Sequence, residues 1–371
     1  MTIVGGGAIG LATAWRAAQA GHDVTVVDPD PGRGASWAAA GMLAPVTEAH
    51  YGEEPLLALN LAASEQWPGF ATELAEASGM DAGYRRCGAI TVARDLDDQA
   101  ALAELFAFQQ GLGLAVQRMT GSEVRRVEPS LSPRVRGGVF ASEDHQVDNR
   151  ALVQALVRAA GRAGVTYDHR RVARIDCHGG RVRAVVTEDG HRLQGDTVIV
   201  AAGVGAAALP GVPEGVVPPL RPVKGQLLHL RGVPAACPRL GVVRGLEVYV
   251  VSRGDGRVVV GATMEERGMD TTVTAGAVME LLRAAWELLP GLAELELLEA
   301  TAGLRPATPD NAPAVGPTEI EGLHLAVGHF RNGILLTPIT ARTVVAGLDG
   351  PLPDLMAPFS PDRFRTAAAR R

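Results

Sequence analysis

Apolar runs and one alanine-rich stretch at the start of the chain predict a compact α/β unit. The run Thr2–Val4 predicts a short buried strand, and after a glycine-rich turn the segment from about Gly10 to Ala20 predicts a helix. The apolar run Val24–Val27 predicts a second buried strand, which ends at Asp28. Together these elements predict a β-α-β unit.

The remaining pattern divides the chain into helical and β-rich parts. Apolar positions at helical spacing predict helices over 57–78, 97–111, 149–163, 275–289 and 333–347. Isolated strands are expected at 88–93 and 323–327. Short β-like runs follow one another without helices at 165–167, 172–175, 182–187, 197–201, 226–230, 247–251 and 258–262. A run of strands without helices suggests an antiparallel sheet, so we expect an α/β fold whose second domain is α+β.

Composition narrows the possible classes of protein. The 371 residues suggest two domains, and 47% hydrophobic with 20% charged residues is a normal globular balance. A net charge of −6 provides no basic surface for nucleic acid or an anionic membrane. The three cysteines form no CxxC and the histidines show no metal-ligand spacing, so no metal site is expected. Neither a leader peptide nor a membrane-spanning run is readable, and we expect a cytoplasmic protein.

A glycine motif lies between the first strand and the first helix. The segment Gly5-Gly6-Gly7-Ala8-Ile9-Gly10 matches GxGxxG, and Asp28 closes the next strand. Gly5 would allow the tight turn, Gly7 the approach of a pyrophosphate, and Gly10 close helix–strand packing. The helix N-terminus would face phosphate, and Asp28 would accept hydrogen bonds from ribose hydroxyls. The alternative is a glycine-rich turn in an unrelated α/β fold.

A small-residue segment, 33–43, follows this unit directly. Small side chains allow backbone to run close to a large flat ligand, although a tightly packed loop or helix would use the same residues. Both FAD and NAD use the β-α-β unit. The motif therefore predicts a dinucleotide site but does not distinguish FAD from NAD.

Five segments together resemble the glycine/D-amino-acid oxidase family of FAD-dependent flavoproteins, and most closely its glycine oxidase branch of thiamine biosynthesis. They are Val4–Gly10 with Asp28, Ala38–Leu43, Val198–Gly203, Gly261–Met264 after Tyr249, and Ala302–Pro306 with Gly328–Ile334. The resemblance implies a Rossmann-like FAD-binding domain and a discontinuous substrate domain with an antiparallel sheet. We expect the FAD-binding domain at 1–80, 142–215 and 300–371, and the substrate domain at 81–141 and 216–299.

The resemblance also implies the residues that hold the cofactor. The segment around Gly41 would lie along the flavin, and Val172 would contact adenine through its backbone. The covalently flavinylated sarcosine oxidases carry a cysteine near the positions of Arg305 and Arg331, and this chain has none there, so we expect non-covalent FAD. The expected FAD contacts are Gly5, Gly7, Ala8, Ile9, Gly10, Asp28, Ala35, Ser36, Ala40, Gly41, Met42, Val172, Ala201, Gly203, His329, Phe330, Arg331, Asn332, Gly333, Ile334 and Leu335.

Five side chains are candidates for the chemistry. The resemblance implies that Arg305 clamps the substrate carboxylate, as the planar fork of a guanidinium can, and that the Tyr249 hydroxyl supports it. It makes Met264 and Met42 pocket-lining residues. Arg331 would close the site or contact substrate, and the helix beginning near Gly333 would direct its N-terminus at the flavin. Without the family resemblance, Arg305 would be interpreted as a surface arginine and Tyr249 as a core tyrosine. Met42 and Met264 would be core methionines, and Arg331 would be a helix-capping or surface arginine.

The expected function is oxidation of glycine, or of sarcosine and small D-amino acids, to the imine with O2 as the electron acceptor. Three alternatives stay open: a flavin dehydrogenase that feeds a quinone, an NAD-dependent dehydrogenase, and a non-catalytic flavin- or nucleotide-binding module. Family members are often homotetramers, so a homo-oligomer is expected.

Overall fold

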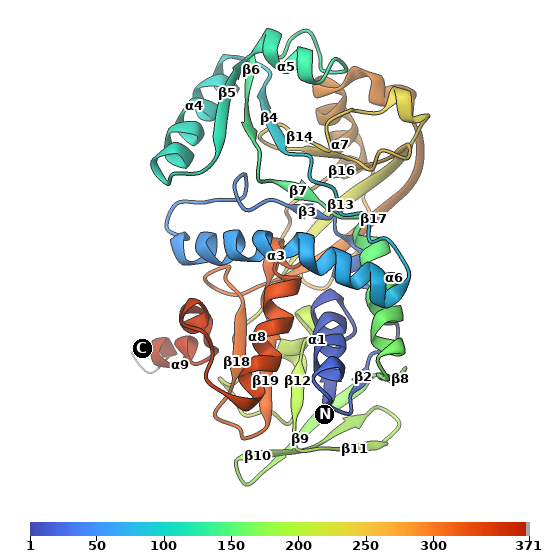
Figure 1. Cartoon of the computed structure of the whole chain (residues 1–371), viewed down its shortest axis with the longest axis vertical. Helices are drawn as coiled ribbons and strands as arrows, with labels where there is room; N and C mark the ends of the chain where they lie inside the picture. Colours follow the sequence, from blue (N-terminus) through green and yellow to red (C-terminus); the bar gives the residue numbers. More distant parts are fainter. Residues whose placement is uncertain (369–371) are drawn as a thin grey trace.

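Two large sheets dominate the computed structural model, which describes residues 1–368, and they lie one above the other in Figure 1. The lower sheet belongs to an α/β layer that contains the N-terminus. The upper sheet carries a separate set of helices. The long helix α3 (Glu54–Ser78) runs across the molecule between the two parts.

The six-stranded sheet contains the predicted β-α-β unit. Its order is β18 (Ala314–Pro317), β19 (Leu323–Val327), β12 (Val198–Val200), β1 (Thr2–Val4), β2 (Thr25–Val27) and β8 (Thr166–Asp168). All pairs are parallel except β18 with β19. Because parallel strands buried on both faces are apolar throughout, the short runs of Val, Ile and Thr suit these positions.

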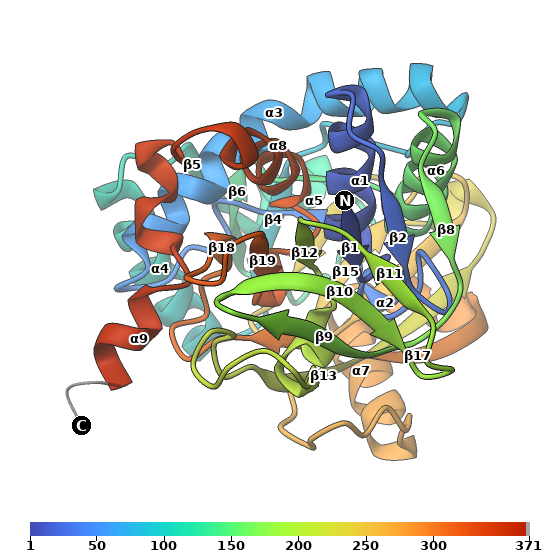
Figure 2. The same ribbon diagram turned by 90° about the horizontal axis from the view of Figure 1, so that it is seen from below.

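Both faces of this sheet are covered. The helices α1 (Ala8–Gln19), α3, α6 (Asn149–Arg162) and α8 (Thr337–Asp349) pack on one face around buried residues such as Leu11, Trp15 and Trp67. The other face packs against a three-stranded sheet of β9 (Val172–His178), β10 (Arg181–Thr187) and β11 (Arg192–Gln194). Figure 2 shows these layers from below.

The eight-stranded sheet is antiparallel apart from one parallel pair, β14 with β4. Its order is β17 (Glu296–Ala307), β13 (Arg221–Arg231), β16 (Arg257–Gly261), β15 (Tyr249–Ser252), β14 (Val242–Arg244), β4 (Ala89–Ala93), β6 (Gly137–Ala141) and β5 (Val116–Thr120). Its Val- and Leu-rich core packs against α7 (Ala275–Leu288) and α5 (Gly121–Val127). The helix α4 (Leu96–Gly111) covers the β4–β6 end.

Short elements connect the two parts. The strands β3 (Met42–Leu43) and β7 (His145–Gln146) form a two-stranded sheet between them. The helix α2 (Ala35–Ala38) lies beside β17, and α9 (Arg363–Ala368) ends the described chain. No helix within residues 1–368 is long and apolar enough to cross a membrane.

The fold class expected from the sequence is confirmed, including a separate antiparallel sheet, but the β-like runs of the middle do not all belong to that sheet. Strands β8 and β12 join the parallel sheet, β9 to β11 form their own sheet, and β13 to β16 lie in the eight-stranded sheet. Sequence adjacency cannot separate these sheets, because strand pairing depends on contacts between distant residues.

The boundaries of two expected segments differ from the structure. The last long helix begins at Thr337 rather than near Gly333, because a 3-10 turn (Phe330–Asn332) and further turns precede it. Strand β17 continues to Ala307 within the eight-stranded sheet, beyond the expected domain boundary at residue 300. The final residues of that expected segment, 369–371, lie outside the described residues.

Candidate active site

A cavity of about 1280 Å³ lies between the two sheets and is lined by residues from both parts. One end is lined by Gly5, Asp28 and Val172 from the α/β layer. The other end is lined by Tyr249 and Arg305 from the eight-stranded sheet. The cavity therefore joins the dinucleotide fingerprint to the candidate catalytic residues.

The glycine turn packs as the fingerprint predicts. Gly5 has a φ of +106°, a conformation that favours glycine. A Cβ at Gly10 would overlap the carbonyl oxygen of Gly5, so Gly10 allows α1 to pack against the turn. The Asp28 carboxylate accepts a hydrogen bond from the Gly6 N–H at 2.7 Å and faces the cavity.

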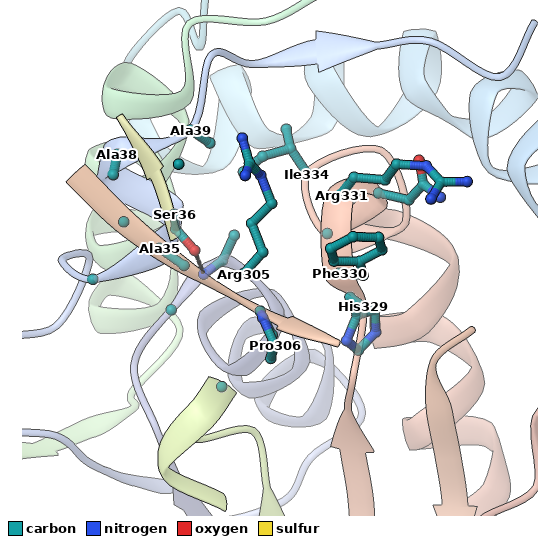
Figure 3. A pocket seen from close by; sticks show the side chains of 18 of the residues that line it. Ala35, Ser36, Ala38, Ala39, Arg305, Pro306, His329, Phe330, Arg331 and Ile334 are labelled. Carbon is teal, nitrogen blue, oxygen red and sulfur yellow. Dashed lines mark hydrogen bonds between the residues drawn. The ribbon is translucent and has the colours of Figure 1, made fainter. Parts of the chain in front are cut away.

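The small-residue segment forms one wall of the cavity. Figure 3 shows Ala35, Ser36, Ala38 and Ala39 along this wall, and the Ser36 hydroxyl accepts a hydrogen bond from the Ala8 N–H at 2.9 Å. The hydroxyl thereby satisfies one of the N–H groups that the first turn of a helix leaves without an intrahelical partner. This contact fixes the wall against the start of α1.

A half-buried arginine that the sequence did not reveal, Arg253, holds the same segment. Arg253 donates to the carbonyl oxygens of Ala40 and Val147, each at 2.7 Å, and to the side chain of Asn149 at 3.1 Å. Asn149 in turn donates to the carbonyl of Ser36 at 2.9 Å. Burial lowers the pKa of Arg253 to about 10, so it remains charged at neutral pH. No local motif marks this residue, because its partners are distant in sequence.

Most of the residues predicted to contact FAD line this cavity, and two do not. Gly10 lies behind the glycine turn. Leu335 is buried in the helical core, where its carbonyl accepts a hydrogen bond from Trp67 Nε1 at 2.8 Å. The lining residues are Gly5, Gly7, Ala8, Ile9, Asp28, Ala35, Ser36, Ala40, Gly41, Met42, Val172, Ala201, Gly203, His329, Phe330, Arg331, Asn332, Gly333 and Ile334.

The turn that precedes α8 supplies the wall opposite the small-residue segment. Phe330 has a φ of +46°, which is uncommon for a residue with a side chain. His329 is buried, with Nε2 3.1 Å from Thr340 Oγ1, and burial lowers its pKa to about 3. His329 is therefore a neutral imidazole at physiological pH.

Arg305 projects from β17 into the cavity between these two walls (Figure 3). Its guanidinium lies over Gly225, where a side chain would overlap it, and donates to the Thr263 carbonyl at 3.2 Å. No carboxylate within residues 1–368 lies within 4.0 Å of this guanidinium. Arg305 is thus held by neutral groups, and its charge is available to a ligand.

Tyr249 lies on the same face of the eight-stranded sheet as this arginine. Burial raises the pKa of the Tyr249 hydroxyl, and the nearby Arg305 opposes part of that rise. The hydroxyl therefore stays protonated at neutral pH and can donate a hydrogen bond. Met42 and Met264 also line the cavity, but Met264 is 68% exposed, which places it at the opening.

Arg331 also lines the cavity, but its charge is already paired. Its Nε lies 3.2 Å from Glu48 Oε2, and its Nη2 contacts Glu53. Glu48 also pairs with Arg244 Nη1 at 2.6 Å. Burial alone would raise the pKa of Glu48, but Arg244 and Arg331 outweigh that effect and lower it overall.

Glu48, Glu53 and Arg244 were not predicted from the sequence. The loop that carries both glutamates, residues 44–53, has no readable periodicity, and only its fold onto β14 brings Glu48 to Arg244. A buried carboxylate anchors this loop: Asp144 accepts from the N–H groups of Val46 and Thr47 at 2.8 and 2.9 Å. Burial raises the pKa of Asp144 to about 6, despite these hydrogen bonds.

The cavity suits an FAD molecule in the character of its walls. It extends from the dinucleotide fingerprint past a wall of alanine and glycine to the substrate end. A Cβ at Gly7 would stand 3.2 Å from Ser36 Oγ, which is a tight contact, so glycine keeps the space beside the helix N-terminus open. The residues present therefore suit a bound dinucleotide.

Comparison with known proteins identifies the class. Residues 1–346 match the family described as FAD dependent oxidoreductase (DAO). The glycine oxidase of Geobacillus kaustophilus is 34% identical over 93% of this chain and 91% of its own length. Its crystal structure superposes with a TM-score of 0.87 over 97% of each chain. The chain therefore belongs to the DAO family of FAD-dependent oxidoreductases, which leaves the NAD-dependent and non-catalytic alternatives without support.

A longer relative is similar over nearly the whole chain. The bifunctional protein ThiO/ThiG of Synechocystis sp. is 37% identical over 98% of this chain. That match covers 54% of the relative, so the chain spans about half the length of the bifunctional relatives it matches.

Proposed function

We propose that this protein is an FAD-dependent oxidase of glycine that also accepts sarcosine and small D-amino acids. Glycine, O2 and water would give glyoxylate, ammonia and hydrogen peroxide, with the imine as the first product. The observation that carries the proposal is Arg305, a guanidinium with no carboxylate partner in the described chain, in a cavity continuous with the dinucleotide fingerprint. The similarity to glycine oxidases supports the substrate class.

Arg305 and Tyr249 would position the substrate. The guanidinium fork would bind the carboxylate through two hydrogen bonds, and the protonated Tyr249 hydroxyl would donate a third. This arrangement would orient the Cα–H toward the flavin, which supplies the hydride acceptor when bound. Positioning of this kind can account for much of a rate enhancement without a protein acid or base.

The FAD itself would be held without a covalent bond. The lining residues of the fingerprint, the segment 35–42 and the turn 328–334 would surround it, with Val172 near the adenine end. Gly10 and Leu335 would act indirectly, through helix packing. Arg331 would support the wall of the site rather than bind the substrate carboxylate, because Glu48 and Glu53 already occupy it.

The wider setting is also part of the proposal. Resemblance to the glycine oxidases of thiamine biosynthesis supports a role in supplying the imine for the thiazole ring. We further propose a cytoplasmic homo-oligomer, with a tetramer as the expected size. Light scattering on the purified holoenzyme would give the mass, and a monomer would contradict that part.

An anaerobic absorbance spectrum with and without glycine tests the central claim. A flavin band that bleaches on addition of glycine supports the cofactor, the reaction and the substrate together. A band that persists with glycine but bleaches with another small amine would change the substrate. Oxygen consumption with peroxide formation then separates an oxidase from a dehydrogenase, which would reduce a dye without forming peroxide.

A further inference from the structure

Three arginines, Arg244, Arg305 and Arg331, surround the proposed carboxylate site, and only Arg305 has no carboxylate partner in the described chain. Arg244 and Arg331 are paired with Glu48, and Arg331 also contacts Glu53. Two other charged residues complete the wall: Arg221 pairs with Glu266 at 2.7 Å, and Glu247 is 75% exposed at the rim. Around the proposed carboxylate site, Glu48 and Glu53 therefore offset the charges of Arg244 and Arg331, and the positive charge of Arg305 remains.

Glu48 is the carboxylate that the two paired arginines share. Its two oxygens contact different arginines, Arg244 at 2.6 Å and Arg331 at 3.2 Å. All three side chains are under one-fifth exposed, so water screens their charges weakly. Without Glu48, Arg244 would have no carboxylate partner in the described chain, and Arg331 would keep only Glu53.

The position of Glu48 is fixed by its neighbours. The preceding residue, Thr47, is bound by Asp144 and accepts a hydrogen bond from Arg244 Nη1 at 3.0 Å. Gln109 donates to the Val46 carbonyl at 3.1 Å. The loop therefore presents Glu48 to the arginines without depending on a bound substrate.

The paired arginines lie within reach of the proposed carboxylate site. Arg244 on β14 is directly opposite Tyr249 on β15, so the two side chains share one face of the sheet as near neighbours. The Glu48 charge also acts on the Tyr249 hydroxyl. A second carboxylate on a substrate held by Arg305 and Tyr249 would extend toward this group and meet the negative charge of Glu48.

We propose that Glu48 is a specificity-determining residue that restricts the site to amines with a single carboxylate, by neutralising Arg244 and, together with Glu53, Arg331. The inference deepens the proposed function and rests on it. Removal of the Glu48 charge would leave a second cationic position for dicarboxylate amines such as iminodiacetate or D-aspartate. A relative with 28% identity is an iminodiacetate oxidase, so the fold can accommodate such a substrate.

Binding of simple carboxylates to the oxidised holoenzyme tests the proposal without turnover. Acetate, malonate, succinate and glutarate are titrated while the flavin absorbance spectrum is followed. The natural protein should bind acetate at least tenfold more tightly than any of the three dicarboxylates. In Glu48→Gln, at least one dicarboxylate should gain roughly tenfold or more in affinity, and acetate should change much less.

Glu53→Gln is the matched control, because it removes one negative charge as Glu48→Gln does but leaves Arg244 paired with Glu48. It should not produce the gain, and adding Arg244→Met to Glu48→Gln should cancel it. Equal binding of acetate and malonate by the natural protein would overturn the proposal even if Glu48→Gln fails to fold. So would a folded, flavin-loaded Glu48→Gln protein with unchanged dicarboxylate affinities.

Turnover of glycine separates this inference from the proposed function. If the natural protein discriminates among the carboxylates but does not oxidise glycine, the proposed reaction fails and the role of Glu48 stands. If glycine is oxidised and the discrimination is absent, only the role of Glu48 fails. If no carboxylate perturbs the flavin spectrum, the Arg305 clamp and the inference built on it both fail.

Discussion

The three arginines at the substrate end of the cavity differ in their partners rather than in their residue type. Arg305 rests on Gly225 and on a backbone carbonyl, whereas Arg244 and Arg331 contact half-buried carboxylates. A guanidinium that is already paired gains little from a further anion, because its charge is largely compensated. The available charge of Arg305 is what makes it the clamp.

Replacing Arg305 with Met should lower kcat/KM for glycine by roughly 100-fold or more, since a buried charge-assisted pair is lost. Arg305→Lys should recover part of this loss, because it keeps the charge without the planar fork. Steady-state oxygen consumption measures both variants, and Arg283→Met, at an exposed position of α7, is the control. Unchanged kcat/KM in Arg305→Met would show that the carboxylate binds elsewhere.

At the scale of elements, the junction of β1 and α1 depends on close packing at one position. Gly10→Ala would force a Cβ onto the Gly5 carbonyl, at a cost of about 3 kcal/mol in the free energy of unfolding. FAD affinity should fall as well, because the turn beside the phosphate site would move. Urea unfolding and flavin fluorescence measure the two effects.

Gly69→Ala is the matched control for this substitution. Gly69 lies in α3 with open space around its Cβ position, so alanine there should be neutral or stabilising by up to about 1 kcal/mol. Equal effects of the two substitutions would contradict the packing argument.

The loop 44–53 should contribute a pH dependence to stability through Asp144. Burial raises the folded-state pKa of Asp144 from 3.8 to about 6, so its contribution is complete below pH 4 and is lost as pH rises through 6. The free energy of unfolding, relative to that of Asp144→Asn, should therefore fall by about 3 kcal/mol between pH 4 and pH 7.

Urea unfolding of both proteins at the two pH values measures this difference. The same groups titrate elsewhere in both chains, so their contributions cancel in the comparison. A natural protein that gained stability over Asp144→Asn as pH rose would contradict the assigned direction of the pKa shift.

At the scale of the whole molecule, the cavity is a seam between the two sheets rather than a cleft within one of them. Residues from both parts line it. Arg253, in the turn between β15 and β16, also binds the Ala40 carbonyl of the small-residue segment and the Val147 carbonyl. A ligand in this seam would contact both parts at once. Bound FAD should therefore contribute to their joint stability.

Removing FAD should lower the melting temperature by several degrees. At a free concentration of FAD a hundredfold above its Kd, the stabilisation is about 3 kcal/mol. Differential scanning calorimetry of the apoprotein, with and without added FAD, measures it. AMP is the control ligand, and it should restore only part of the shift because it would occupy one end of the seam. An apoprotein as stable as the holoenzyme would contradict a cofactor that bridges both parts.

Local patterns in the sequence determined the N-terminal β-α-β unit and several individual helices and strands. These elements were predictable because each depends on residues near one another in the chain, such as the glycines of the fingerprint and the apolar run before Asp28. Arg305 and Tyr249 became candidates only through resemblance to a family, since no local pattern distinguishes them from a surface arginine and a core tyrosine.

Only the tertiary structure decided how the strands of the β-rich middle divide among three sheets and which arginine keeps a free charge. Both depend on contacts between residues that are far apart in sequence. Glu48 meets Arg244 and Arg331 across about 200 and 280 positions, and Arg253 meets Ala40 across 213. Such pairs leave no periodic signal in the sequence, because the partners come together only when the chain folds and the low-exposure interior strengthens their interaction.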